Sequence, residues 1–310
     1  MKEHTSAMSY KGEKPCVVTI GTFDGVHVGH KAILERLVAT ARKDGMDSVL
    51  LTFFPHPRMV LQKQSNIKLI NTISEKKELL NEIGLDHLIV HPFTAEFSRL
   101  SAVEFVRDIL VNALNAGKVI IGYDHRFGRN RTASIEDLKE FGEIYDFEVE
   151  EISAQEISEV TVSSTKIRKA IKTGDITTAN QFLGYPFMLS GIVVKGKSIG
   201  RTIEYPTANL QIQEGYKLIP GNGVYVVFSE INGGLVYGIT SIGTNPTVGG
   251  EKQTIETYFL DFDGDLYDKE LRIEFITRIR GEETFESVSE LKEAIQKDEE
   301  FARNFLKHFG

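Results

Sequence analysis

The chain has 310 residues, which is long for a single hydrophobic core and predicts two domains. Its 36 Lys and Arg residues against 44 Asp and Glu residues give a net charge of −8, so no general affinity for nucleic acid or for an anionic membrane is expected. The apolar fraction of 41% is typical of a globular protein, and no apolar run reaches the roughly 18 residues that suggest a membrane span.

The N-terminal region gives two further indications. Residues 1–14 are polar and lack the apolar segment of a signal peptide, which predicts a loose tail. The lone cysteine, Cys16, lies in a predicted strand, so no disulfide can form within the chain. A buried, reduced thiol in a cytoplasmic protein is therefore expected.

From Cys16 to Gly184 strand-like and helix-like runs alternate, which predicts βαβ units and a parallel sheet. Ser101 with Glu104, and Ser134 with Asp137, have the spacing of capping boxes at helix starts. The strand-like runs are 17–20, 49–54, 87–90, 119–122 and 147–152. Residues 21–30, 55–57 and 122–128 each follow such a run, so we expect them to converge at the carboxyl edge of the sheet, where ligands bind.

The first of these segments, residues 21–30, reads GTFDGVHVGH and leads into an amphipathic helical run. A helix N-terminus favours a phosphate through its free N–H groups and its dipole. His27 and His30 are three residues apart and can face the same anion. The residues therefore suggest a nucleotide phosphate site, with a metal-binding pair or two structural histidines as the alternatives.

A second candidate, residues 163–168, reads SSTKIR and also resembles a helix start. Its hydroxyls and two cations suit the oxygens of a triphosphate. The alternative is an ordinary N-cap followed by a solvated Lys and Arg.

After Gly184 the pattern changes to strand-like runs separated by turn signals, which predicts an antiparallel sheet or small barrel. A C-terminal helix follows, with Ser287 and Glu290 at its start. The strand-like runs are 188–195, 224–230, 235–242, 255–262 and 271–277. We therefore predict a polar tail at 1–14, an α/β domain at 15–184 and a β-barrel domain at 185–310.

Residues 191–198, GIVVKGKS, match the pattern of a phosphate-binding P-loop. A P-loop must open a helix, but the residues between its glycines are strand-like here. The following Tyr205-Pro206 also disfavours a long helix. We therefore interpret this match as coincidental.

Taken together, GTFDGVHVGH and SSTKIR resemble the HxGH-type nucleotidylyltransferases. The longer form, with Phe23-Asp24-Gly25, resembles the FAD synthetase half of bacterial bifunctional riboflavin kinase/FAD synthetases. Residues 54–57 (FPHP) and 121–128 (IGYDHRFG) fit the same family, although His125 stands where a Phe is expected. Residues 200–210 (GRTIEYPTANL) resemble the riboflavin kinase motif, and the resemblance extends from about residue 15 to residue 303.

For the first domain, a Rossmann-like nucleotidylyltransferase, the resemblance implies the reaction FMN + ATP → FAD + pyrophosphate. His27 and His30 would bind the triphosphate and stabilise the transition state, and Mg²⁺ would screen the phosphates. The remaining implied contacts are to the nucleotide and its phosphates by Gly21, Phe23, Asp24, Gly29, Asp124, Ser164, Thr165 and Arg168, and to the flavin by Pro55, His56 and Phe127.

For the second domain, the resemblance implies phosphorylation of riboflavin to FMN by ATP. Thr207 and Asn209 would ligate Mg²⁺, and Glu256 would accept the proton of the flavin hydroxyl. Gly200 and Arg201 would contact phosphate.

Several residues of the second domain depart from the family's usual ones, namely Tyr185, Glu204, Tyr205, Tyr258 and Asp268. The Glu204 carboxylate would stand beside a phosphate-binding turn, where like charges repel. Two alternatives to the bifunctional enzyme therefore remain. One is an FAD synthetase with a weak or inactive kinase half, and the other is a non-catalytic flavin-binding regulatory protein.

Overall fold

The computed structural model describes residues 1–62, 66–123, 125–153, 162–196, 204–247 and 250–309. The chain forms two compact units, which we describe separately. The first comprises Met1–Lys68 and Ile73–Ser163, and the second comprises Leu69–Thr72 and Ser164–Gly310. In the parts of the chain that the structure describes, no helix is long and apolar enough to cross a membrane.

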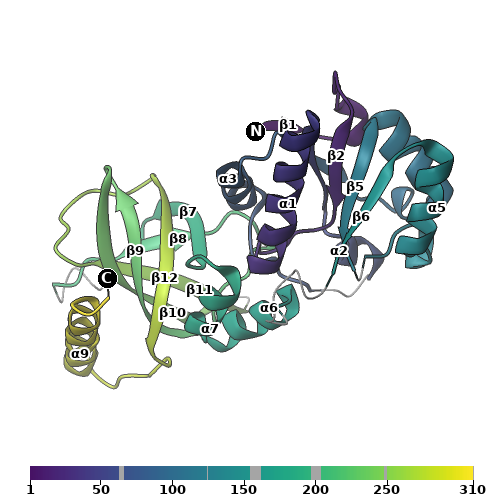
Figure 1. The fold of residues 1–310 in the computed structure, drawn as a ribbon. Helices are drawn as coiled ribbons and strands as arrows, with labels where there is room; N and C mark the ends of the chain where they lie inside the picture. Colours follow the sequence, from purple (N-terminus) through teal and green to yellow (C-terminus); the bar gives the residue numbers. More distant parts are fainter. Residues whose placement is uncertain (63–65, 124, 154–161, 197–203, 248–249, 310) are drawn as a thin grey trace. The chain divides into compact units, whose positions relative to one another are not determined.

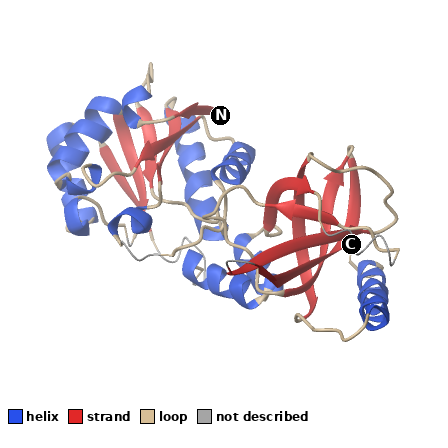
Figure 2. Cartoon of the chain, turned by 180° about the vertical axis from the view of Figure 1, so that it is seen from behind, coloured by secondary structure: helices blue, strands red, loops and turns tan. Residues whose placement is uncertain are grey.

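The first unit is a six-stranded parallel sheet with the strand order β1-β4-β3-β2-β5-β6. Figures 1 and 2 show helices packed against this sheet. All five residues of the central strand β2 are buried, as expected for a parallel strand covered on both faces. The strands are β1 (Lys2–His4), β2 (Cys16–Ile20), β3 (Asp47–Phe54), β4 (His87–Pro92), β5 (Ala116–Gly122) and β6 (Glu148–Ile152).

Two helix starts of this unit are those that the predicted capping boxes mark. Ser101 and Ser134 each form a capping box, with Glu104 and Asp137 respectively. The helices are α1 (Val28–Asp44), α2 (Pro57–Leu61), α3 (Ile73–Ile83), α4 (Ala102–Glu104), which continues as the π-helix η3 (Phe105–Ala113), and α5 (Ile135–Tyr145), with short 3-10 turns η1 (Ala7–Ser9), η2 (Phe97–Arg99) and η4 (Arg129–Arg131).

The strand order places a topological switch point beside β2. β2 pairs in parallel with β3 on one side and with β5 on the other. The chain runs outward through β3 and β4, returns to β5, and continues to β6 on the far side. Residues 21–30, 55–57 and 122–128 therefore leave three adjacent strands at the same edge, as predicted.

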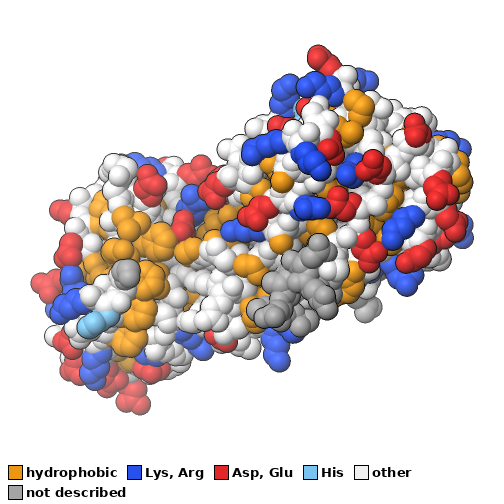
Figure 3. Space-filling view, viewed as in Figure 1, with side chains coloured by type: hydrophobic (Ala, Val, Ile, Leu, Met, Phe, Trp, Pro, Cys, Tyr) orange, Lys and Arg blue, Asp and Glu red, His pale blue; other side chains and the backbone are white. Residues whose placement is uncertain are grey.

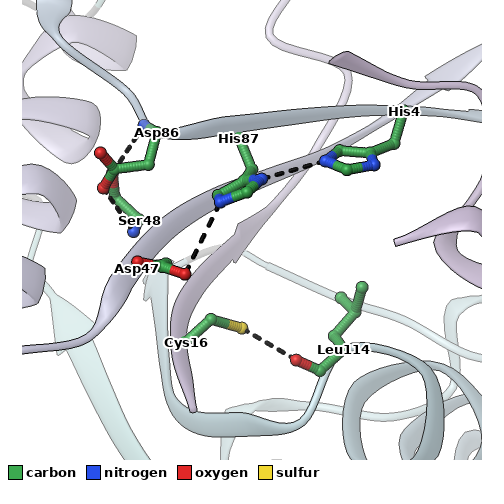
Figure 4. Close-up of polar contacts among 7 residues, drawn as sticks. All are labelled: His4, Cys16, Asp47, Ser48, Asp86, His87 and Leu114. Atoms are coloured by element: carbon green, nitrogen blue, oxygen red, sulfur yellow. Dashed lines mark hydrogen bonds and ion pairs between the residues drawn. The ribbon is translucent and has the colours of Figure 1, made fainter. Parts of the chain in front are cut away.

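The N-terminal segment differs from the predicted loose tail. β1 pairs in parallel with β4, and Ala7 and Tyr10 are buried. His4 Nε2 lies 3.0 Å from His87 Nδ1, and the other ring nitrogen of His87 lies 3.6 Å from an Asp47 carboxylate oxygen (Figure 4). A three-residue strand is too short to show a period, so the ring contacts that order this segment could not be read from the sequence.

The second unit is a closed, antiparallel six-stranded barrel with the order β10-β11-β8-β7-β12-β9. The predicted strands are all present, and the short β8 is an addition. Gly191 lies within β7, which agrees with the rejection of a P-loop. The strands are β7 (Met188–Val194), β8 (Ala208–Gln211), β9 (Gly223–Ile231), β10 (Gly234–Thr247), β11 (Gly250–Phe259) and β12 (Glu270–Arg280).

Helices from both ends of this unit pack on the barrel. α9 (Val288–Leu306) covers part of its outer face, where Ala302 is buried and Arg280 of β12 makes two hydrogen bonds of 2.9 and 2.8 Å to the Asp298 carboxylate. Apolar side chains gather on this unit on the face shown in Figure 3. α6 (Ser164–Thr173) and α7 (Ile176–Leu183) precede the barrel, and the Asn180 side chain bonds to the backbone of Phe187 and Phe275.

The division between the units lies earlier in the chain than the predicted boundary at 184, because α6 and α7 pack with the barrel. The short segment Leu69–Thr72 also belongs to the second unit. Buried Lys217 donates to the Ile70 carbonyl at 2.6 Å, and Asn71 bonds to Tyr185. These contacts are long-range in sequence, so the motifs alone could not locate the division.

The His4–His87 pair makes stability of the first unit dependent on pH. Burial lowers the pKa of both imidazoles, so below about pH 6.5 the unfolded chain binds protons that the folded one excludes. We expect the melting temperature to fall as the pH drops from about 7 to about 5, and to fall less in a His4→Gln, His87→Gln variant. Thermal unfolding followed by circular dichroism measures this. The exposed His308→Gln variant should retain the wild-type slope, and an unchanged slope in the double variant would contradict the prediction.

Candidate functional site

The turn between β2 and α1 is held at its helix end by His27. His27 is the N-cap of α1, and its Nδ1 accepts a hydrogen bond from the His30 backbone N–H at 3.3 Å. In the neutral ring the proton therefore resides on Nε2. The rings of His27 and His30 stack with centroids 3.6 Å apart and an interplanar angle of 16°. The two imidazoles predicted to face one ligand are thus in direct contact.

The backbone of this turn is strained. Phe23, Gly25 and Val26 have φ values of 42°, 91° and 33°, a region that side chains other than glycine disfavour, above all a branched one such as Val26. The Phe23 ring packs 4.7 Å from the His30 ring. A Cβ on Gly21 would approach the Phe23 ring to 2.9 Å, so a glycine is needed there. Strain of this kind concentrates at ligand sites, where the surrounding structure maintains it.

Burial keeps both histidines neutral. It lowers the pKa of His27 to about 4, against the opposing effect of the Asp24 carboxylate. It holds the pKa of His30 well below its usual value, with further lowering from His27 and from the Lys76 ammonium. At neutral pH the pair therefore offers neutral N–H donors, and an arriving polyphosphate would favour their protonation.

The alternative of a metal site has no support here. Among the residues that the structure describes, no group of three His, Cys, Asp or Glu side chains could hold a metal ion. The combination of a helix N-terminus and imidazole donors suits an anion instead.

Lys76 of α3 belongs to this site and was missed in the sequence. Its Nζ donates to the Thr22 carbonyl at 2.7 Å, and the residue is only 4% exposed. The sequence did contain an indication of its burial. Lys76 lies three and four residues before Leu79 and Leu80, so it shares the apolar, buried side of its helix.

The neighbouring loops place the other predicted residues of the first unit. Asp24 is 1% exposed, and Gly29 is buried in the first turn of α1. His56 is the buried N-cap of α2 and follows the exposed Pro55. Asp124 lies outside the described residues.

Phe127 and His125 lie on the loop after β5. Phe127 is 7% exposed and packs 5.9 Å from Phe105 in the hydrophobic core. The His125 ring stacks on Phe127 at 6.4 Å. His125 thus covers the outer side of a core aromatic residue, which is a place that a Phe would also fill.

In the second unit, α6 begins at Ser164, as the SSTKIR pattern predicts. Thr165 is exposed and Arg168 is half-buried. Their spacing of three residues places them on the same side of the helix, in its first turns, where the dipole favours anions.

The barrel brings together three residues that the sequence separates. Asn209 of β8 lies directly opposite Glu256 of β11, and Thr207 Oγ1 donates to Glu256 Oε2 at 3.3 Å. Gly196 permits this arrangement, because a Cβ there would collide with the Asn209 amide. The predicted Gly200 and Arg201 lie outside the described residues. The result is a carboxylate with a hydroxyl and an amide beside it on one face of the sheet.

A pocket of about 400 Å³ opens beside Thr207. Such a volume accommodates a small organic ligand. Its walls combine apolar and aromatic side chains with hydroxyls and carboxylates. The lining includes Val193, Pro206, Phe259, Phe262, Asp265 and Tyr267.

The residues that differ from the expected kinase residues make contacts within the second unit. Glu204 has a φ of 69° and its carboxylate accepts a hydrogen bond from Lys292 of α9 at 2.7 Å. Lys292 also lowers the pKa of Glu204. The Tyr205 and Tyr258 rings pack edge to face, 5.0 Å apart. The unusual negative charge at the turn is therefore paired within the unit.

Known proteins match the chain over nearly its full length. A family model of FAD synthetase matches residues 9–166, and one of riboflavin kinase matches residues 183–306. The bifunctional riboflavin kinase/FMN adenylyltransferase of Listeria monocytogenes is 38% identical over 94% of this chain and 92% of its own length. This chain belongs to the bifunctional riboflavin kinase/FMN adenylyltransferase family.

The protein of the same name from Escherichia coli K12 is 36% identical over 96% of this chain and 95% of its own length. A crystal structure from Streptococcus pneumoniae, titled as a macrolide-efflux protein, matches with a TM-score of 0.89 and 33% identity over 98% of both chains. As a member of the riboflavin kinase/FMN adenylyltransferase family, the chain is an enzyme that converts riboflavin to FMN and FMN to FAD, with ATP as the second substrate. The predicted family, fold class and bifunctional activity are confirmed.

The Glu204–Lys292 pair yields a prediction for the kinase half. Lys292→Met leaves the Glu204 charge without this partner, so the KM for ATP in riboflavin phosphorylation should rise several-fold at low salt and less at high salt. Adding Glu204→Gly should reverse the rise, since it removes the charge and suits a positive φ. Steady-state kinetics measures both effects, with the exposed Lys297→Met as the control. An unchanged KM in Lys292→Met would refute the prediction.

Proposed function

We propose that His27 and His30 form the adenylyl-transfer centre of this enzyme. The observation that carries the proposal is the stacked, neutral imidazole pair at the N-terminus of α1, next to the switch point of the sheet. Gly21, Phe23, Asp24 and Gly29 would shape the nucleotide site around it. Ser164, Thr165 and Arg168 would hold the β- and γ-phosphates, and this assignment rests on the SSTKIR motif.

In this reaction a phosphate oxygen of FMN attacks the α-phosphorus of ATP, and the bond from that phosphorus to the β-phosphate oxygen breaks. The FMN phosphate is already an anion at neutral pH, so the enzyme needs no strong base. Its task is to align the reactants and to neutralise the charge that develops on the departing pyrophosphate. The N–H groups of the two imidazoles and the first turn of α1 would serve this purpose. Pro55 and His56 would contact the flavin, together with the loop of Asp124 and Phe127.

We propose that Glu256 is the base of riboflavin phosphorylation. An alcohol is a weak nucleophile until its proton is accepted, and Glu256 is a carboxylate within hydrogen-bond distance of Thr207. The flavin oxygen would then attack the γ-phosphorus of ATP, and ADP would leave. The pocket beside Thr207 would take the planar ring of one substrate, and Gly200 and Arg201 would contact phosphate.

Mg²⁺ would arrive with ATP as the MgATP substrate. The hydroxyl of Thr207 and the amide oxygen of Asn209 are hard oxygen ligands of the kind this ion accepts, and both stand beside Glu256. Neutral ligands suit an ion whose charge the triphosphate already balances.

We further propose that the enzyme acts in the cytoplasm. Burial raises the pKa of Cys16 to about 12, so this lone thiol is unreactive. A chain without disulfides is typical of a reducing compartment.

The adenylyl-transfer centre is tested by His30→Ala. We expect the rate of FAD formation from FMN and MgATP to fall by about 10²–10³, the typical loss for one transition-state donor, while FMN formation from riboflavin continues. Chromatography of the flavin products separates the two activities. His308→Ala, which changes an exposed histidine, should be fully active. Undiminished FAD formation in His30→Ala would rule out the assignment.

Glu256→Gln tests the kinase centre in the same assay. Loss of the base should lower FMN formation by about 10²–10⁴ and leave FAD formation from added FMN nearly intact. Glu230→Gln, an exposed substitution on β9, is the matched control. Equal loss of both activities would contradict independent centres, and wild-type protein that makes FAD from FMN but no FMN from riboflavin would identify a single-activity enzyme.

A further inference from the structure

The ammonium of Lys76 lies beneath the turn that carries the histidine pair. Its Nζ donates to the Thr22 carbonyl at 2.7 Å, and Thr52 Oγ1 of β3 donates to the same oxygen at 3.2 Å. Thr22 lies between Gly21 and the strained Phe23, so this carbonyl orients the start of the turn. Two donors from two different elements thus fix one peptide group of the candidate site.

A lysine is an unusual choice for such a position. Lys76 is 4% exposed, and burial of an ammonium is unfavourable unless other groups compensate for it. A leucine would pack into an apolar helix face at no such penalty. Burial lowers the pKa of Lys76 to about 8, against the opposing effect of Asp24, so the ammonium form persists at neutral pH. The charge itself therefore requires an explanation beyond packing.

We propose that Lys76 is a positioning residue for FAD synthesis: it holds the Thr22 carbonyl and supplies a fixed positive charge below the phosphate site formed by His27 and His30. This inference rests on the proposed adenylyl-transfer centre. The charge acts on the bound triphosphate through the turn, and the same charge favours neutral, hydrogen-bond-donating histidines in the free enzyme.

Several charged and titratable groups surround Lys76, and a pH profile must distinguish their ionisation from that of Lys76. Asp24 of the turn and His30 of α1 interact electrostatically with the Lys76 ammonium. Glu75 is buried beside it on α3. Lys77 on α3 pairs with Glu3, and Arg42 of α1 lies near Gly84, after the end of α3. Both histidines have lost their protons well below neutrality, so Lys76 is the group here that titrates near pH 8.

The experiment measures kcat/KM for ATP in FAD formation from FMN between about pH 7 and about pH 9, since this ratio reports ionisations of the free enzyme. For the wild type we expect a decline above about pH 8, as Lys76 loses its proton. Lys76→Met should lower kcat/KM at pH 7 by about tenfold or more and remove the alkaline decline, because no ammonium remains to titrate. A purely structural role would lower the rate without changing the shape of the profile.

Controls separate this role from misfolding and from failure of the centre itself. Lys77→Met changes the adjacent, more exposed lysine and should keep the wild-type profile. Lys76→Gln retains a donor for the Thr22 carbonyl and replaces the Met variant if thermal unfolding shows that the latter is not folded.

A wild-type profile without an alkaline decline, or a Lys76 variant that retains the decline or the full rate, overturns the proposal. If His30→Ala is inactive while the Lys76 variants are unaffected, only the role of Lys76 fails; if His30→Ala is fully active as well, the centre fails with it.

Discussion

The junction between a buried parallel strand and the N-terminus of a helix is the constraint on which the first unit depends. All residues of β2 are buried, so the strand cannot shift its register without exposing apolar side chains. The chain must then turn within seven residues into α1, whose N-cap is His27. This forces the positive φ values of Phe23 and Val26 and delivers both imidazoles to the free N–H groups of the helix.

The two candidate sites of the enzyme differ in their charge. Around the turn, burial keeps two histidines neutral and lowers the pKa of Lys76, but only to about 8, so Lys76 keeps its positive charge at neutral pH. On the barrel, the carboxylate of Glu256 stands on a half-exposed sheet face beside a hydroxyl and an amide. This difference would suit the two proposed centres, because a phosphate is already ionised and an alcohol needs a base.

Much of the fold and of the site was predictable, for reasons that particular residues make clear. The apolar stripe of α1 and the capping boxes at Ser101 and Ser134 are local patterns, and local patterns persist in the folded chain. The short strands β1 and β8 were not predictable, because three or four residues carry no period. Lys76 was overlooked because a charged residue within a helix is ordinarily taken as exposed.

The sequence by itself determined the contiguous parts of this protein: the turn with its two histidines, the helix start at Ser164, the alternation of strands and helices, and the family resemblance. Tertiary structure decided which distant residues meet. It placed Thr207 and Asn209 against Glu256, Lys292 against Glu204, and the ammonium of Lys76 against the Thr22 carbonyl. The physical reason is distance along the chain. The hydrogen-bonded residues are 49 apart for Thr207 and Glu256, 88 apart for Glu204 and Lys292, and 54 apart for Thr22 and Lys76, so only closure of the barrel and packing of the helices brings them into contact.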